Sequence, residues 1–217
     1  MTFYSEKSKE KNILEALNAY YPSIKIALNF SNVWELLVAT ILSAQCTDER
    51  VNIITKDLFV KYTTIPEYAN APLEEITYSI RSAGLFRSKA GYIKKSAQKI
   101  LKNYSGHVPK TMSELLSLPG VARKTANVVL YNGYGKNEGI AVDTHVKRIS
   151  NLLGLTESEN PQKVEKDLLS LYPREEWGNL NHRLVQYGRD ICIARRPKCE
   201  ICVLKKECAH YQKTLQK

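Results

Sequence analysis

Long apolar runs are absent from this 217-residue sequence. No segment approaches the roughly 18 consecutive apolar residues that a membrane-spanning helix requires, so no membrane partner is expected. The first residues, 1–12, are of mixed charge and lack the hydrophobic stretch of a secretory signal. We therefore expect a cytoplasmic protein, or a nuclear or mitochondrial one if the source is eukaryotic.

Convincing strand patterns, internal repeats and low-complexity tracts are also missing. Helix signals follow one another instead, and the predicted class is all-α. Residues 33–44 are apolar almost all round, which predicts a central buried helix opened by a capping box at Asn32–Glu35. Further helices are expected at residues 51–62, 85–110, 114–117, 124–131, 143–153 and from Asn160 onward.

Acidic residues are scarce relative to basic ones. The chain has 32 Lys and Arg against 22 Asp and Glu, which gives a net charge of +10 and a pI near 9.3. Such an excess favours a polyanionic partner, most commonly nucleic acid, although charge alone does not decide this. Residues 85–110 contain no acidic side chain, and their lysines form one face of the expected helix. That face is either a solvated surface or, given other evidence for DNA, a surface that follows phosphates.

The segment Leu118–Ala126 combines a turn with the start of a helix. Gly120 permits a tight turn and the helix begins directly after it, so unpaired backbone N–H groups face outward. Such a helix N-terminus binds anions, and Arg123 adds a side chain that pairs with phosphate. A plain turn between two helices would show the same Pro-Gly. The whole segment favours a hairpin that grips a DNA backbone without reading its sequence.

This hairpin resembles that of the helix-hairpin-helix DNA glycosylases, and residues 142–145, Val-Asp-Thr-His, match a second segment of that superfamily. Lys124, directly after the hairpin, is similar to the lysine of the endonuclease III branch, whose members are bifunctional glycosylases. The resemblance extends from Glu35 to Cys208. One departure is Ala122, where the family usually has a second glycine. If that position needs φ > 0, alanine costs about 1 kcal/mol there.

The resemblance implies two helical lobes with a DNA-binding cleft between them. Residues 26–135 would form a six-helix barrel that contains the hairpin, and residues 1–25 with 136–217 would form an iron–sulfur cluster lobe. The implied activity is base-excision repair on duplex DNA by a monomeric enzyme. It would remove oxidised pyrimidines and cut the strand 3′ to the abasic site by β-elimination. The hairpin would contact DNA through Gly120, Val121, Ala122 and Arg123.

Lys124 and Asp143 carry the chemistry that the resemblance implies. The amine of Lys124 would attack sugar C1′ and form a Schiff base, for which it must be neutral. A helix N-terminus and partial burial both disfavour an ammonium group and so favour the neutral amine. The carboxylate of Asp143 would stabilise positive charge on the sugar and assist proton movement. Taken singly, Lys124 could be a phosphate contact, Asp143 an N-cap, and His145 either a support for the site or a structural residue.

Four cysteines, Cys192, Cys199, Cys202 and Cys208, form the pattern C-x6-C-x2-C-x5-C. In an intracellular chain such a group predicts a metal site rather than disulfides. Structural zinc usually uses two C-x2-C pairs, and only one is present here. The spacing resembles the [4Fe–4S] loop of the endonuclease III family, for which we expect a structural role.

The loop between the first two of these cysteines carries Arg195, Arg196 and Lys198, which we expect to contact DNA phosphates. The fifth cysteine, Cys46, lies far from the other four in the sequence and is expected to be a buried apolar thiol.

A base inside a duplex must be flipped out before it can be attacked, and something must fill the gap. The resemblance suggests Gln45 and Leu85 for this role, although ordinary packing would also explain both.

Three rival functions stay open at this point. An adenine-mismatch glycosylase would carry an acidic residue near Ala39 and would lack Lys124. A uracil or thymine mismatch glycosylase is compatible with Lys124, which indicates lyase activity and not the choice of base. A non-catalytic helix-hairpin-helix module would explain the charge, the hairpin and the cysteines, but it would leave Lys124 and Asp143 without a role.

Overall fold

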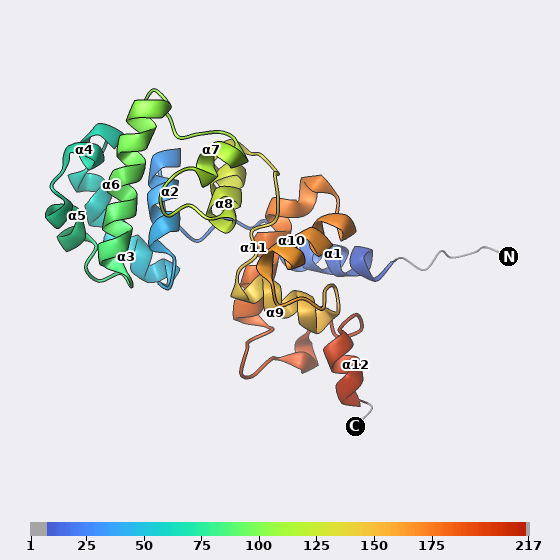
Figure 1. The fold of residues 1–217 in the computed structure, drawn as a ribbon. Coiled ribbons are helices and arrows are strands. Elements are labelled where there is room, and N and C mark those ends of the chain that lie inside the picture. Colours follow the sequence, from blue (N-terminus) through green and yellow to red (C-terminus); the bar gives the residue numbers. More distant parts are fainter. Residues whose placement is uncertain (1–7, 216–217) are drawn as a thin grey trace. The chain divides into compact units, whose positions relative to one another are not determined.

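The computed structural model describes residues 8–215, and the chain divides into two compact units (Figure 1). The hairpin unit spans residues 26–138, and the cysteine unit joins the described residues before it, 8–25, to those after it, 139–215. The sequence-based boundary was residue 135, where the structure has 138. All regular elements within residues 8–215 are helices, which confirms the predicted all-α class. None of the described helices combines the length and apolarity needed to cross a membrane.

The hairpin unit is built around one buried helix, α2. All of α2 except Val33 and Glu35 is buried, because its side chains are apolar on nearly every face. It packs against α3, α6 and α8, while α4 and α5 pack against α6 (Figure 1). The helices of this unit are α2 (Val33–Leu42), α3 (Asp48–Lys61), α4 (Ile65–Asn70), α5 (Leu73–Ser79), α6 (Phe86–Asn103), α7 (Met112–Leu116) and α8 (Arg123–Tyr134).

The start of α2 follows the predicted capping signal with one difference. The side-chain oxygen of Asn32 accepts a hydrogen bond from the backbone N–H of Glu35 at 3.0 Å, as the motif requires. The reciprocal bond goes elsewhere, because the Glu35 carboxylate accepts from the backbone N–H of Ser31 at 2.6 Å. The helix ends at Leu42, earlier than the expected residue 44. Residues 43–47 therefore form a loop before α3 begins.

The cysteine unit places the first helix of the chain among helices from its last third. The side chains of Ile13 and Leu17 lie in one apolar core with those of Val146, Leu180 and Leu184. The elements of this unit are α1 (Lys9–Tyr20), α9 (Thr144–Leu153), α10 (Pro161–Leu171), the 3-10 turn Arg174–Glu176, α11 (Trp177–Asp190), the 3-10 turn Cys199–Ile201 and α12 (Ala209–Leu215).

The basic face predicted for residues 85–110 is only partly correct. Arg87, Lys95 and Lys102 are exposed, as a solvated or phosphate-following surface requires. Lys89 is buried instead, with 2% of its surface exposed. The ammonium groups of Lys94 and Lys99 donate to backbone carbonyls, those of Ala71 and Ser117. These three lysines therefore stabilise the fold of the hairpin unit rather than line a uniform charged face.

Candidate functional site

The predicted hairpin is present between α7 and α8 and rests on α6. Gly120 has φ +77, and an added Cβ would lie 2.7 Å from ring atoms of Tyr92. Only glycine meets both conditions, a left-handed backbone and a close approach to a neighbour. The hydroxyl of Ser96 donates to the carbonyl of Pro119 at 2.9 Å and ties the turn to α6. The turn is closed by a hydrogen bond of 3.2 Å from the N–H of Val121 to the carbonyl of Leu118.

Ala122 introduces no backbone strain into the hairpin. Its φ of −93 and ψ of 171 are ordinary extended values, so the second glycine of the family is not needed for a left-handed turn here. Ala122 is the N-cap residue of α8, and within the described chain no side chain caps that helix start. The first backbone N–H groups of α8 therefore keep the anion-binding character that the sequence predicts.

Lys124 is the second residue of α8 and is exposed. The expectation that burial within the protein desolvates its amine is therefore wrong. What the structure does provide is the position in the first turn, where the helix dipole disfavours a positive charge. An exposed side chain in that position is also accessible to a macromolecular substrate.

Asp143 is the N-cap of α9 in the cysteine unit. One carboxylate oxygen, Oδ1, accepts a hydrogen bond from the backbone N–H of Val146 at 2.8 Å. A carboxylate has two oxygens and about four acceptor positions, so one capping bond leaves most of that capacity available. The capping role and a chemical role are thus compatible. His145 lies in the same first turn and packs closely on α11, because a Cβ added at Gly188 would be 2.5 Å from its Nδ1 atom.

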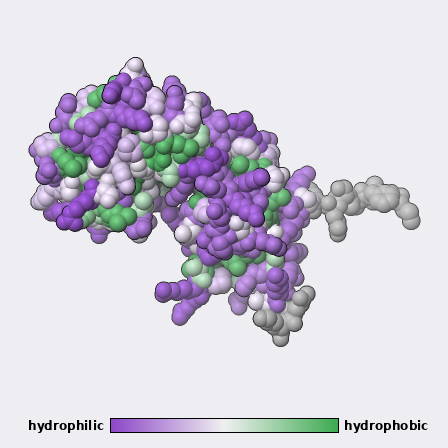
Figure 2. Space-filling view, in the orientation of Figure 1, coloured by the Kyte–Doolittle hydropathy of each residue, from purple (hydrophilic) through white to green (hydrophobic). Residues whose placement is uncertain are grey.

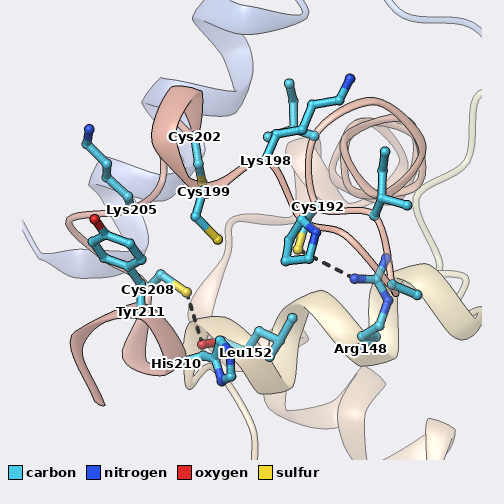
Figure 3. A pocket seen from close by; sticks show the side chains of 14 residues that line it. Arg148, Leu152, Cys192, Lys198, Cys199, Cys202, Lys205, Cys208, His210 and Tyr211 are labelled. Carbon is cyan, nitrogen blue, oxygen red and sulfur yellow. Dashed lines mark hydrogen bonds between the residues drawn. The ribbon is translucent and has the colours of Figure 1, made fainter. Parts of the chain in front are cut away.

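The four clustered cysteines line one cavity of about 240 Å³ in the cysteine unit (Figure 3). The cavity lies between the segment after α11 and the helix α9, which contributes Arg148 and Leu152 to its wall. In Figure 3 the sulfurs of Cys192, Cys199 and Cys208 point toward a common space. The sequence pattern has therefore identified side chains that share one site.

Each of three thiols already has one polar neighbour. A guanidinium nitrogen of Arg148 lies 3.5 Å from the sulfur of Cys192, and the hydroxyl of Tyr187 lies 3.0 Å from that of Cys202. The thiol of Cys208 donates to the carbonyl of Leu152 at 3.5 Å. Burial raises the pKa of the Cys192 thiol, with Arg148 acting in the opposite direction, and burial also raises the pKa of the Cys199 thiol.

The four thiols line a cavity and do not converge on a single position. Among residues 8–215 no three His, Cys, Asp or Glu side chains converge closely enough to hold a metal ion. All four thiols line one cavity, and cysteine thiolates are the usual ligands of iron–sulfur clusters, so the residues present fit such a group.

The loop between the first two of these cysteines is basic and open to solvent. Arg195, Arg196 and Lys198 are all exposed, as a role in phosphate contact requires. Cys46 is partly accessible, so its expected full burial is wrong.

Gln45 and Leu85 lie on adjacent loops of the hairpin unit and share an unusual backbone. Their φ angles are +53 and +57, in the left-handed region that favours glycine, and both residues are exposed. The loops abut, since a Cβ added at Gly84 would be 2.8 Å from the carbonyl oxygen of Gln45. Leu85 exposes 57% of its surface and so has little packing role within the unit.

Sequence reasoning missed the part that Lys89 plays beside these loops. Its ammonium group donates to the carbonyls of Leu42 and Ala44 at 2.7 and 2.6 Å. A signal was available, because Lys89 lies four residues before Ile93 and therefore on the apolar stripe of α6. Lys89 was instead grouped with the exposed basic residues of the segment, although its spacing places it on the buried face.

The chain is similar to known proteins over nearly its whole length. The family described as HhH-GPD superfamily base excision DNA repair protein matches residues 38–174. An endonuclease III of Synechocystis sp. is 46% identical over 208 residues, which are 96% of this chain and 95% of that relative.

Two solved structures are also similar. A non-covalent endonuclease III–DNA complex is 42% identical, with a TM-score of 0.91 over 97% of this chain and 100% of that one. A trapped endonuclease III–DNA covalent intermediate, an estranged-adenine complex, is 42% identical, with a TM-score of 0.90 over 96% and 99%.

Proposed function

The chain belongs to the HhH-GPD superfamily of base excision DNA repair proteins and, within it, to the endonuclease III family, and on that premise we propose its function. It is a base-excision-repair DNA glycosylase with AP lyase activity that acts on duplex DNA. Its substrates are oxidised or ring-saturated pyrimidines, and it cuts the strand 3′ to the abasic site.

The observation that carries this function is the position of Lys124. It is an exposed amine in the first turn of α8, directly after a hairpin whose backbone N–H groups suit a phosphate. The same short segment therefore supports both binding of the DNA backbone and attack on the sugar. A trapped covalent DNA complex of a relative that is 42% identical is in keeping with a nucleophile of this kind.

In the proposed reaction the neutral amine of Lys124 attacks C1′ of the damaged nucleotide. The C1′–N bond to the base breaks, and the base leaves with the electron pair and takes up a proton. Ring opening then gives a protonated Schiff base between C1′ and Nζ of Lys124. Loss of a proton from C2′ expels the 3′ phosphate by β-elimination, and water finally releases the amine.

Asp143 supplies the negative charge for this sequence. Its carboxylate stabilises the positive charge that develops on the sugar as the base departs. Its capping bond to Val146 fixes the orientation of the carboxylate, so its position does not depend on substrate binding.

DNA is held through its phosphates by two surfaces. One is the hairpin, through Gly120, Val121, Ala122 and Arg123. The other is the exposed basic loop of Arg195, Arg196 and Lys198. Phosphate contacts carry no sequence information, which suits an enzyme that must scan sequences of every kind.

Cys192, Cys199, Cys202 and Cys208 would hold a [4Fe–4S] cluster. Such a cluster bound there would supply cross-links between α11, the 3-10 turn and the start of α12, and base excision itself transfers no electrons. The chain contributes a cavity lined by all four thiols, and a cluster there would anchor both ends of the basic loop.

Gln45 and Leu85 fill the gap left by the flipped nucleotide. Both are exposed and lie on adjacent loops, which suits side chains that enter a duplex together. The enzyme acts as a monomer, located with the DNA in the cytoplasm, or in the nucleus or mitochondrion if the source is eukaryotic. The face in view in Figure 2 is largely hydrophilic with small scattered apolar patches, which is typical of a surface without a large obligate interface.

The test is borohydride trapping on duplex DNA that contains thymine glycol or an abasic site. We expect the wild-type chain to form a covalent adduct on both substrates, and Lys124→Ala to form none while still binding the duplex. Lys136→Ala, which removes an exposed lysine–carbonyl contact at Lys110, is the matched control and should trap normally.

An adduct that persists in Lys124→Ala would reject Lys124 as the nucleophile. Strand cleavage without any adduct would indicate a water mechanism instead. Processing of mismatched uracil or thymine in preference to thymine glycol would keep the lyase and change the substrate class.

A further inference from the structure

Lys89 is a residue of α6 that bonds to two neighbouring loops, the one before α6 and the one after α2. It lies in the first turn of α6, with its backbone N–H donating to the carbonyl of Leu85 at 3.1 Å. Its ammonium group reaches the opposite loop and donates to the carbonyls of Leu42 and Ala44 at 2.7 and 2.6 Å. One residue therefore bonds directly to the segments that carry Leu85 and Gln45.

The carbonyls that Lys89 contacts stand at the end of α2. The last carbonyls of a helix have no partner within it and form the negative end of its dipole, so a cation is favoured there. Burial acts in the opposite direction and lowers the pKa of the Lys89 ammonium group. Leu42 is the last residue of α2, and Ala44 directly precedes Gln45. Lys89 thus caps the helix and fixes the point at which the chain turns toward Gln45.

The two loops need such a restraint, because each holds a strained residue. Gln45 and Leu85 both adopt a left-handed backbone that non-glycine residues rarely occupy, and such conformations persist only where the surroundings hold them. Gly84 allows close approach of the loops, since any side chain there would meet the carbonyl of Gln45. The contact between the loops is therefore made by backbone atoms. Lys89 stabilises it through its hydrogen bonds to the carbonyls of Leu42 and Ala44.

We propose that Lys89 is a positioning residue for nucleotide flipping, which holds the Gln45 and Leu85 loops together so that both side chains enter the duplex as one wedge. This inference rests on the proposed function. It gives a role in flipping to a residue that is buried within the protein and does not itself contact the DNA. Loss of the ammonium group would let either loop relax independently. Base extrusion would then fail while the chemistry at Lys124 stayed intact.

The experiment compares Lys89→Met with Lys94→Met. Lys94 also donates from α6 to a backbone carbonyl, that of Ala71, but it contacts neither loop, so it controls for loss of a lysine–carbonyl bond. Two duplexes separate flipping from chemistry. One carries thymine glycol paired with adenine, and the other carries a preformed abasic site, which has no base to unstack. A fluorescent purine analogue beside the lesion reports unstacking.

We expect Lys89→Met to excise thymine glycol at least about tenfold more slowly than Lys94→Met and to lose the rise in fluorescence, with borohydride trapping at the abasic site within about twofold of wild type. Gly84→Ala should show the same split, because it disturbs the same junction without touching Lys89. Gly91→Ala, where an added Cβ meets nothing, is its control.

Equal behaviour of Lys89→Met and Lys94→Met would overturn the proposal. An equal loss on both duplexes would also overturn it, since that indicates a general defect of folding or chemistry. If Lys89→Met fails to fold, the Gly84→Ala and Gly91→Ala pair decides by the same criteria. Failure of the wild-type chain to trap either duplex would instead reject the proposed function, and the role of Lys89 with it.

Discussion

The hairpin unit and the cysteine unit hold their candidate functional residues in different ways. In the hairpin unit, Gly120 rests on the ring of Tyr92, and the loops around Gln45 are secured by Lys89. In the cysteine unit, the segment 192–208 contains one short 3-10 turn, and within it only Leu204 is part of the buried core. The first arrangement is made by the protein alone, whereas the second has little apolar packing to hold it.

This difference indicates that the two units are stabilised in different ways, one by packing and the other partly by metal ligation. The residues of the hairpin unit that are proposed to enter or grip the duplex are preorganised by backbone and packing, which needs no cofactor. A loop that presents exposed positive charges has few apolar side chains to bury, and metal ligation can replace that missing core. Perturbing the two units should therefore give effects of different kind and size.

The largest effect is expected from Cys199→Ser, which removes one ligand of the proposed cluster. Iron and sulfide content should fall, and segment 192–208 should lose several kcal/mol of stability, roughly 5, because ligation replaces apolar packing there. Hydrogen exchange should show loss of protection in residues 192–208 and little change in 26–138. Cys46→Ser is the control. Equal loss of protection in both units would contradict the division.

The second effect tests the protein-only arrangement at Gly120. Gly120→Ala puts a side chain on a left-handed backbone and against the Tyr92 ring, so DNA affinity should fall by about 30-fold, or roughly 2 kcal/mol. Gly135→Ala is matched, because Gly135 also has positive φ (+65) but open space around it. Gly135→Ala should lower stability by about 1 kcal/mol and leave DNA affinity unchanged, as fluorescence anisotropy can measure.

A smaller effect should follow from neutralising the basic loop. Replacing Arg195, Arg196 and Lys198 together by Gln should reduce the slope of log affinity against log salt by up to about 0.9 per lost phosphate contact. The change should not depend on DNA sequence, because these contacts carry no base information. Lys163→Gln, at an exposed position in α10, should leave the slope unchanged. A loss of affinity that is independent of salt would argue against phosphate contact.

The smallest effect is expected at Ala122. Its backbone is already extended, so Ala122→Gly relieves no strain and should change DNA affinity by less than about threefold, or ~0.6 kcal/mol. A gain of tenfold or more in the same anisotropy titration would show that the family's second glycine has a role in the bound hairpin that its free backbone conformation does not reveal.

Much of the fold could be predicted because the signals are local. Asn32, Asp143 and Asn160 cap the helices that their side chains predict, and Gly154 ends α9 with φ +72. Capping depends on residues within one turn, so the sequence alone suffices. The four clustered cysteines could likewise be grouped from spacing before the cavity they share was seen.

The remaining features depend on neighbours distant in the sequence. Exposure of Lys124 and burial of Lys89 are decided by which helices pack beside them, and charge counting cannot distinguish the two. The left-handed backbone of Gln45 and Leu85 arises where two loops meet, so it could not be predicted from either residue type. The bond from Ser31 to Glu35 also shifts by one residue from the expected motif, a difference that only the local geometry settles.

The position of α1 has a consequence for folding during synthesis. Ile13 and Leu17 pack with residues of α9 and α11, and the side-chain amide of Asn12 donates to Glu207 at 3.0 Å. The hairpin unit is inserted between these partners in the chain, so its helices leave the ribosome and can fold while α1 still lacks a core. At about 5–20 residues per second, that delay is on the order of ten seconds. Until the final helices are made, the first helix exposes an apolar stripe that chaperones, or other nascent chains, can bind.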